Sequence, residues 1–159
     1  MKILRKTEPN IYYKAEGFHI AAQVLNQANE MQYRGSPFIV NATFAIELYL
    51  KCFDGQTIFN RPSEYCEGVT QYENVTSEGS NRGHDLGKLF NNLNDENRKQ
   101  ISTAFEKRIS GITSEEFFEK YRDHFVSWRY GFEGNATAYS PSEILVMLEV
   151  LKECASQYI

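Results

Sequence analysis

The segment from Pro37 to Phe53 constrains the fold more than any other part of the chain, because it is apolar nearly all the way round a helix. Its apolar residues leave no clear polar stripe: Phe38, Ile39, Val40, Phe44, Ile46, Leu48, Tyr49, Leu50 and Phe53. A helix of this kind is stable only where other elements surround it. The sequence therefore predicts a helix over 37–53 in the middle of a bundle.

The remaining apolar residues recur mainly at helical spacing, and strand-like alternation is weak. Helices are predicted near 11–33, 85–110, 114–132 and 142–158, and the one over 85–110 is expected to restart near Asp95. Gly35, Ser36 and Pro37 separate the helix over 11–33 from the helix over 37–53. The predicted fold is all-α, an antiparallel up-and-down bundle of four to five helices in a single domain over 1–159. Six residues are predicted to be buried: Phe44, Leu48, Tyr49, Leu89, Phe125 and Leu148.

Residues 54–83 are rich in Gly, Ser, Asn and Thr and separate the second predicted helix from the third. A connection of this length inside a compact domain is unusual. We expect a variable, partly irregular loop in which a two-stranded ribbon can form.

Composition narrows the classes of function. A chain of 159 residues with 42% hydrophobic content suits one domain, and 17 basic against 21 acidic residues give a net charge of −4. A diffuse positive field for nucleic acid is therefore absent, so any RNA contact has to be local.

No apolar stretch is long enough for a membrane span and no apolar segment follows the basic N-terminus, which predicts a cytoplasmic protein without a membrane partner. The three cysteines lack C-x-x-C spacing, so we expect reduced thiols, no metal site and no cofactor.

Two charged residues lie within the apolar helix. Glu47 shares a helical stripe with Val40, Phe44 and Lys51, so its carboxylate is expected to be at least half buried and to need a partner. Lys51, one turn later, is the nearest candidate. The two residues form either an isolated ion pair at the edge of the core or part of a larger polar cluster.

Further members of such a cluster come from two other segments. His84 directly precedes a predicted helix start, and Arg129, Tyr130 and Glu133 lie at the end of the helix predicted over 114–132. Arg122 and Arg129 fall on one helical face, so their guanidinium groups are expected to point the same way and to suit phosphate or RNA. Alternatively, Arg129 pairs with a glutamate and only ties helices together.

The other histidines carry weaker signals. His19 lies on the more polar face of the first predicted helix and is expected to be partly exposed, and His124 has no metal-ligand spacing to any Cys or His. The common hydrolase and nucleotide-binding motifs are absent. A catalytic site would therefore use His84 or His124 as the base, with Arg129 on the phosphate.

The order of these signals resembles the HEPN superfamily (higher eukaryotes and prokaryotes nucleotide-binding domain). The resemblance covers roughly 37–133: FAIELYLKCF, a variable loop, GHDLGKLFNNL and the pair Arg129–Tyr130. Its strongest part is the combination of E-x-x-x-K, here Glu47 and Lys51, with H-D-L, which begins at His84. The resemblance implies a helical bundle, often dimeric, that belongs to a toxin–antitoxin or phage-defence system beside a nucleotidyltransferase. The implied partners are a second copy, RNA or a nucleotide, and a nucleotidyltransferase.

Active members of that superfamily are similar to one another in an R-x(4-6)-H motif that cleaves RNA without metal through attack of the 2′-hydroxyl. Arg129 matches the motif arginine, but the matching histidine position falls on Gly134, Asn135 or Ala136. None of these side chains exchanges a proton near neutral pH. The resemblance therefore implies a nucleotide- or RNA-associated binding module without the standard nuclease site.

Two other functions stay open at this point. One is a metal-independent endoribonuclease that uses His84 or His124 with Arg129. The other is a dimerising scaffold in which the polar cluster is purely structural.

Overall fold

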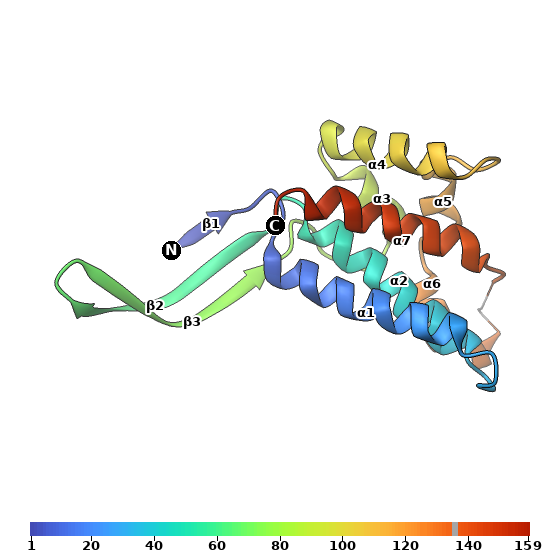
Figure 1. Cartoon of the computed structure of the whole chain (residues 1–159), viewed down its shortest axis with the longest axis horizontal. Coiled ribbons are helices and arrows are strands. Elements are labelled where there is room, and N and C mark those ends of the chain that lie inside the picture. Colours follow the sequence, from blue (N-terminus) through green and yellow to red (C-terminus); the bar gives the residue numbers. More distant parts are fainter. Residues whose placement is uncertain (135–136) are drawn as a thin grey trace.

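The computed structural model describes residues 1–134 and 137–159, and it combines helices with a three-stranded antiparallel sheet (Figure 1). The strands are β1 (Lys2–Leu4), β2 (Gln56–Cys66) and β3 (Val69–Glu78). The helices are α1 (Pro9–Gln27), α2 (Gly35–Cys52), α3 (Leu86–Asn91), α4 (Asp95–Arg108), α5 (Ser114–Lys120), α6 (His124–Arg129) and α7 (Pro141–Ser156), and a 3-10 turn, η1 (Gly131–Glu133), follows α6. The prediction of an all-α fold is therefore wrong.

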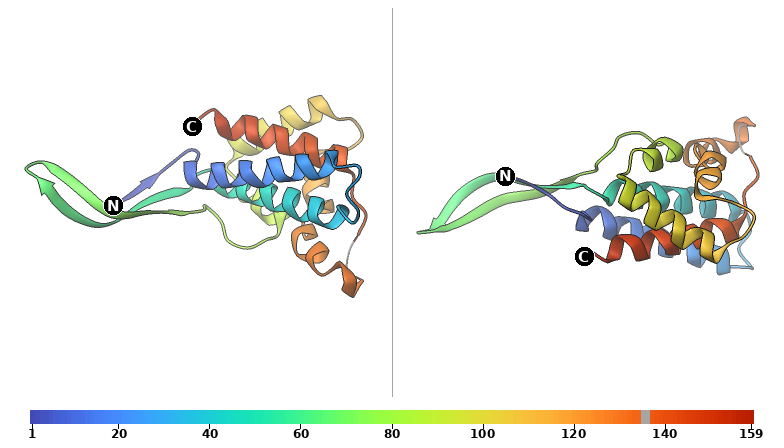
Figure 2. Two further views of the ribbon diagram at one scale, coloured as in Figure 1. Left: turned by 60° about the horizontal axis from the view of Figure 1, so that its bottom comes forward. Right: turned by 90° about the horizontal axis from the view of Figure 1, so that it is seen from above.

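The error lies in residues 54–83, where β2 and β3 form a long ribbon that accounts for most of the segment predicted as a partly irregular loop. The ribbon projects beyond the ends of the helices, and β1 pairs with β2 only near its root (Figures 1 and 2). Most side chains of the ribbon are exposed, so neither of its faces needs the alternation of apolar and polar residues that marks a strand lying on a core.

Helix α2 occupies the centre of the helical part, as its apolar sequence predicts. It packs against α1, α6 and α7 (Figure 2). Of the six residues predicted to be buried, Tyr49, Leu89, Phe125 and Leu148 are buried, whereas Phe44 and Leu48 are only partly covered.

The buried face of α1 includes His19, which was expected to be partly exposed. Tyr12, Ala15, His19 and Ala22 face inward, and His19 is only 1% exposed. Its Nδ1 lies 3.1 Å from the Tyr49 hydroxyl and its Nε2 lies 3.1 Å from Glu149 Oε1 on α7. The Tyr49 hydroxyl gives Nδ1 a hydrogen-bond partner, whereas Nε2 lies close to the Glu149 carboxylate without the geometry of a hydrogen bond.

The helical segment over 85–110 restarts at Asp95 as predicted, and the Asn94 side chain caps the start of α4. The helix predicted over 114–132 is instead broken at Tyr121–Asp123, between α5 and α6. There the Arg122 carbonyl accepts a hydrogen bond from the Leu86 N–H, at 3.0 Å, where a continuous helix would supply its own donor. The break therefore provides a hydrogen-bond acceptor for the first backbone N–H of α3.

The root of the ribbon is fixed by Glu8, which is fully buried. Its carboxylate caps α1 by accepting from the Ile11 N–H at 2.9 Å and also accepts from the Thr57 hydroxyl at 2.9 Å. Gly55 is required at this point, because a Cβ there would lie 2.8 Å from Glu8 Cβ. Within residues 1–134 and 137–159, no helix combines the length and apolar character needed to cross a membrane.

Candidate functional site

A buried carboxylate is the centre of the candidate site. Glu47 on α2 is 1% exposed, and Lys51 Nζ donates to its Oε1 at 2.7 Å. His84 Nδ1 lies 3.0 Å from Oε1 and 2.9 Å from Oε2. The predicted pairing of Glu47 with Lys51 thus belongs to a larger cluster, which we call the Glu47 cluster and define as Glu47, Lys51 and His84.

The path of the chain from the ribbon brings His84 to this position. After β3 the chain passes close to the end of α2, where the Ser80 N–H bonds the Lys51 carbonyl at 3.3 Å. A Cβ at Gly79 would lie 3.1 Å from Lys51 Cβ, so a glycine allows this close approach.

Asp85 then holds the segment in place. Its side chain caps α3 by accepting from the Lys88 N–H at 3.0 Å, and Arg122 Nη2 donates to it at 2.6 Å. Burial raises the pKa of Asp85, but the bonds from Arg122 and Lys88 outweigh this effect and hold the pKa below its usual value. Arg122 also donates to Glu119, so its guanidinium is shared between two acidic side chains beside the segment that carries His84.

The contact with Glu47 fixes the orientation of the His84 ring. An ionised carboxylate only accepts hydrogen bonds, so Nδ1 carries a proton and Nε2 lies on the other side of the ring. The His84 side chain is 54% exposed, and no hydrogen bond to Nε2 occurs in the described part of the chain. Nε2 is therefore available to an incoming molecule.

Arg129 joins this surface through an aromatic ring. Both residues contact Phe125, whose ring centroid lies 5.4 Å from that of His84 and 4.8 Å from the Arg129 guanidinium carbon. Phe44 stacks on Phe125 at 4.7 Å and supports it from α2. No ion pair to Arg129 is found among residues 1–134 and 137–159, so the predicted pairing with a glutamate does not occur there. Its exposed guanidinium keeps its donors for a ligand.

Tyr130 also contacts Arg129, whose guanidinium carbon lies 5.4 Å from the centroid of the Tyr130 ring. Tyr130 and Glu133 line an open depression with Asp123, Val126 and Ser127. Arg122 and Arg129 do not share a helical face, because the chain breaks between α5 and α6.

His124 is 1% exposed, and its Nε2 lies 3.2 Å from both the Ala138 carbonyl and the Thr137 hydroxyl. Its ring is therefore closed to a substrate in this structure. Asn135 and Ala136, two of the positions that match the motif histidine, lie outside the described residues.

Sequence reasoning missed the role of Phe125. It was predicted as a core residue, and its burial is confirmed at 7% exposure, but its ring also connects His84 to Arg129. The four-residue spacing of Phe125 and Arg129 is a signal for such a contact, since residues at i and i+4 are neighbours on a helix.

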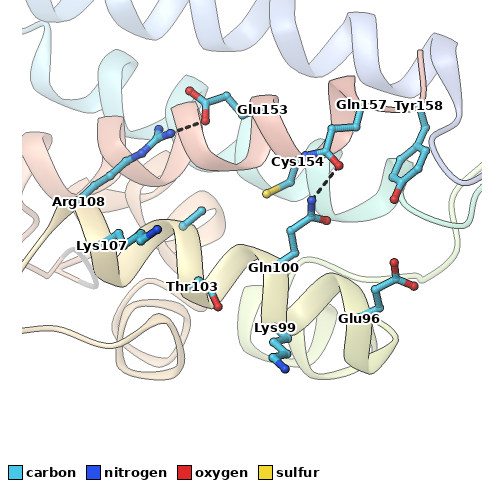
Figure 3. A pocket seen from close by; sticks show the side chains of 11 residues that line it. Glu96, Lys99, Gln100, Thr103, Lys107, Arg108, Glu153, Cys154, Gln157 and Tyr158 are labelled. Atoms are coloured by element: carbon cyan, nitrogen blue, oxygen red, sulfur yellow. Dashed lines mark hydrogen bonds and ion pairs between the residues drawn. The ribbon is translucent and has the colours of Figure 1, made fainter.

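A hollow of about 690 Å³ lies between α4 and α7, away from the residues of the Glu47 cluster (Figure 3). The Gln100–Gln157 hydrogen bond, at 2.8 Å, and the Arg108–Glu153 ion pair cross it (Figure 3). Its lining contains no histidine.

No grouping of three or more metal-binding side chains occurs among the described residues. Comparison with family models, with curated proteins and with solved structures found no match to this chain.

Proposed function

We propose that the surface formed by His84, Phe125 and Arg129 binds the phosphate of a nucleotide or of a short single-stranded RNA. The observation that carries the proposal is the exposed Arg129 guanidinium, which lies on the same aromatic ring as the half-exposed His84. Arginine donors suit phosphate oxygens, and His84 Nε2 donates to them as well once the ring carries a second proton.

Local charge supports an anion at this place. Lys51 pairs with Glu47, and Arg122 is shared between Asp85 and Glu119. Arg129 has no ion pair among residues 1–134 and 137–159, so its positive charge is open to a ligand, and His84 adds another when its ring is protonated.

The surroundings favour a small ligand over a long polyanion. Asp123 and Glu133 line the neighbouring depression, and the whole chain carries a net charge of −4. Tyr130 and Phe132 are 44% and 85% exposed beyond Arg129, and a base can stack on either ring. A nucleotide or a few linked nucleotides therefore fit better than extended RNA, with weak and salt-sensitive binding.

The biological setting is also part of this proposal. We place the chain as a divergent HEPN-like module of a cytoplasmic stress, toxin–antitoxin or phage-defence system. Its proposed partners are a second copy and a nucleotidyltransferase. The support is the motif order FAIELYLKCF, GHDL and Arg129–Tyr130 together with the contact between Glu47 and His84.

The binding test uses a fluorescein-labelled eight-nucleotide single-stranded RNA and anisotropy at low salt. Arg129→Ala should weaken binding about tenfold, the effect of losing roughly 1.4 kcal/mol. Arg61→Ala is the matched control, because Arg61 is exposed on the distant ribbon and pairs with Glu73. Equal losses in the two variants, or no binding by the wild-type chain, would reject the proposal.

A second candidate is metal-independent RNA cleavage with His84 as the general base. The observation in its favour is the Glu47 contact, which leaves His84 Nε2 exposed and able to accept a proton. In this reaction Nε2 takes the proton of the 2′-hydroxyl, whose oxygen attacks phosphorus. The bond to the 5′-oxygen breaks, and this oxygen takes a proton from water, so the products are a cyclic phosphate and a 5′-hydroxyl end.

Incubation of the same RNA with excess EDTA separates the two candidates. A binding module leaves the RNA intact. Cleavage that disappears in His84→Gln and survives in His124→Gln would establish the second candidate. If the wild-type chain is folded and neither binds nor cleaves the RNA, the dimerising scaffold is the function that remains.

A further inference from the structure

The outer edge of β3 carries no strand in the described part of the chain, although its length gives it many backbone donors and acceptors. The sheet order is β1-β2-β3, so β3 has β2 on one side only. Its ten residues span roughly 34 Å at about 3.4 Å per residue. Such an edge is a template for another extended chain.

The two edges of the ribbon are protected differently. On the β2 side, β1 covers Gln56–Ile58, Arg61 has a positive φ of 49°, Pro62 lacks an N–H, and the register shifts between Glu64 and Cys66. Each of these features discourages further pairing. Strand β3 contains no Pro, Lys or Arg. Only one edge of the ribbon is thus left open.

The ladder shows which groups of β3 face outward. The Phe59 N–H donates to the Met1 carbonyl on the β1 side, so Phe59 and its partner Val75 form the pair without mutual hydrogen bonds. The N–H and C=O of Val75 therefore point away from β2, toward the open edge. The direction of the backbone groups alternates from residue to residue along a strand. The N–H and C=O of Glu73, two residues before Val75, therefore also point toward the open edge.

Charge identifies the kind of segment that fits. Between Gln56 and Glu78 the ribbon has one basic residue, Arg61, against four acidic residues, which gives −3: Glu64, Glu67, Glu73 and Glu78. Arg61 pairs with Glu73, and Glu78 lies near Lys2 and Arg82, while Glu64 and Glu67 have no ion pair among the described residues. This surface repels nucleic acid and a second copy of the same ribbon, and it attracts basic chains.

The protein itself contains an example of such pairing. Its N-terminal segment, MKILRK, is basic and extended, and part of it is β1 on the other edge of β2. Lys2 Nζ lies 3.7 Å from Glu78 Oε2, so a lysine of the added strand already reaches a ribbon glutamate.

We propose that the open edge of β3 binds an extended, Lys- or Arg-rich segment of a partner protein by strand addition. Backbone hydrogen bonds to Val75 and Glu73 supply the pairing, and the ribbon glutamates select a basic sequence. This surface lies on the ribbon and is separate from the proposed phosphate site.

The test uses an eight-residue peptide of alternating Lys and Val with blocked ends, titrated into the full chain and followed by amide NMR signals of β3. The control peptide has the same sequence and charge but is N-methylated at alternate residues, so it cannot complete the ladder. We expect it to bind about tenfold more weakly, the effect of losing hydrogen bonds worth about 1.4 kcal/mol. A peptide with Glu in place of Lys should not bind.

Protein variants give an independent comparison. Val75→Pro removes an outward-facing donor and should weaken binding of the Lys–Val peptide about tenfold, whereas Val75→Ala keeps that donor and should stay within about twofold. If the amide NMR signals of the ribbon disappear in Val75→Pro, this variant no longer forms the ribbon. The comparison of the plain and N-methylated peptides on the wild-type chain then tests the proposal by itself. Equal binding of the plain and N-methylated peptides, or no binding, overturns the proposal. A wild-type dimer that Val75→Pro converts to a monomer would also overturn it, because the edge would then hold a second copy.

Discussion

Glu47 shows how one buried charge organises its surroundings. Its carboxylate is nearly inaccessible, and both oxygens have partners from Lys51 or His84. Removing the charge of this buried acceptor weakens its hydrogen bonds from Lys51 and His84, which is expensive in a low-dielectric interior.

Glu47→Gln should therefore lower the free energy of unfolding by about 1–3 kcal/mol, measured by urea denaturation. Glu64→Gln is the matched control, since Glu64 is exposed on the ribbon, and it should change stability by less than about 0.5 kcal/mol. Equal effects of the two substitutions would show that the Glu47 cluster does not stabilise the fold.

His19 should make stability depend on pH. Burial lowers the pKa of His19 below 6.5, although Glu149 opposes this shift in part. Below about pH 6.5 the unfolded chain binds a proton at His19 more readily than the folded chain does. The contribution of neutral His19 to the free energy of unfolding is therefore complete above about pH 6.5 and is lost as the pH falls below that value. Urea denaturation at pH 7.5 and 5.5 should show a smaller pH effect in His19→Gln than in the wild type. An identical pH effect would contradict this assignment.

At the scale of elements, the start of α3 depends on Asp85, which both caps the helix and pairs with Arg122. Asp85→Ala should cost about 1 kcal/mol or more, because the cap and the ion pair are both lost. Asp85→Asn should cost less, because asparagine also caps helices.

The lowered pKa of Asp85 predicts how its contribution to stability changes with pH. Its contribution is present above the unfolded pKa, about 3.9, and disappears as the pH falls through the lower folded value. The difference between wild type and Asp85→Asn should therefore shrink in urea titrations at acid pH. A difference that grows under acid conditions would be the contradictory result.

Part of this architecture could be predicted from the sequence, and the reason is burial. Helix α2 is apolar all round and lies at the centre, and the need of Glu47 for partners predicted its contact with Lys51 or His84. The start of α3 at Asp85 could be predicted as well, because short polar side chains cap helices.

The missed elements share a different physical cause. The ribbon has largely exposed faces, so its sequence lacks the alternation that reveals half-buried strands. The break between α5 and α6 is hidden because Phe117, Tyr121 and Phe125 keep helical spacing and face the same core. The shared contact of Arg129 and His84 with Phe125 depends on this break. The periodicity of apolar residues alone could therefore not predict that contact.

At the scale of the whole molecule, the exposed apolar residues of α1 bear on oligomeric state. Tyr13, Ile20 and Val24 are 57%, 51% and 60% exposed, and their spacing places them along one side of the helix. We predict a homodimer that buries this stripe. Light scattering at micromolar concentration should give twice the monomer mass of 18.4 kDa, and the double variant Ile20→Glu, Val24→Glu should return the monomer mass. A wild-type monomer across this range would contradict the prediction.

The central claim is that His84 and Arg129 together form a phosphate-binding surface, and imidazole NMR tests it most directly. Long-range ¹⁵N–¹H spectra report all three histidine rings, and His84→Gln assigns the signals of the site. We predict that His84 carries its proton on Nδ1, and that the short RNA shifts the His84 Nε2 signal and leaves those of buried His19 and His124 unchanged. In Arg129→Ala this shift should require about tenfold more RNA. An unchanged His84 signal at RNA concentrations that saturate binding, or equal shifts of all three rings, would contradict the account.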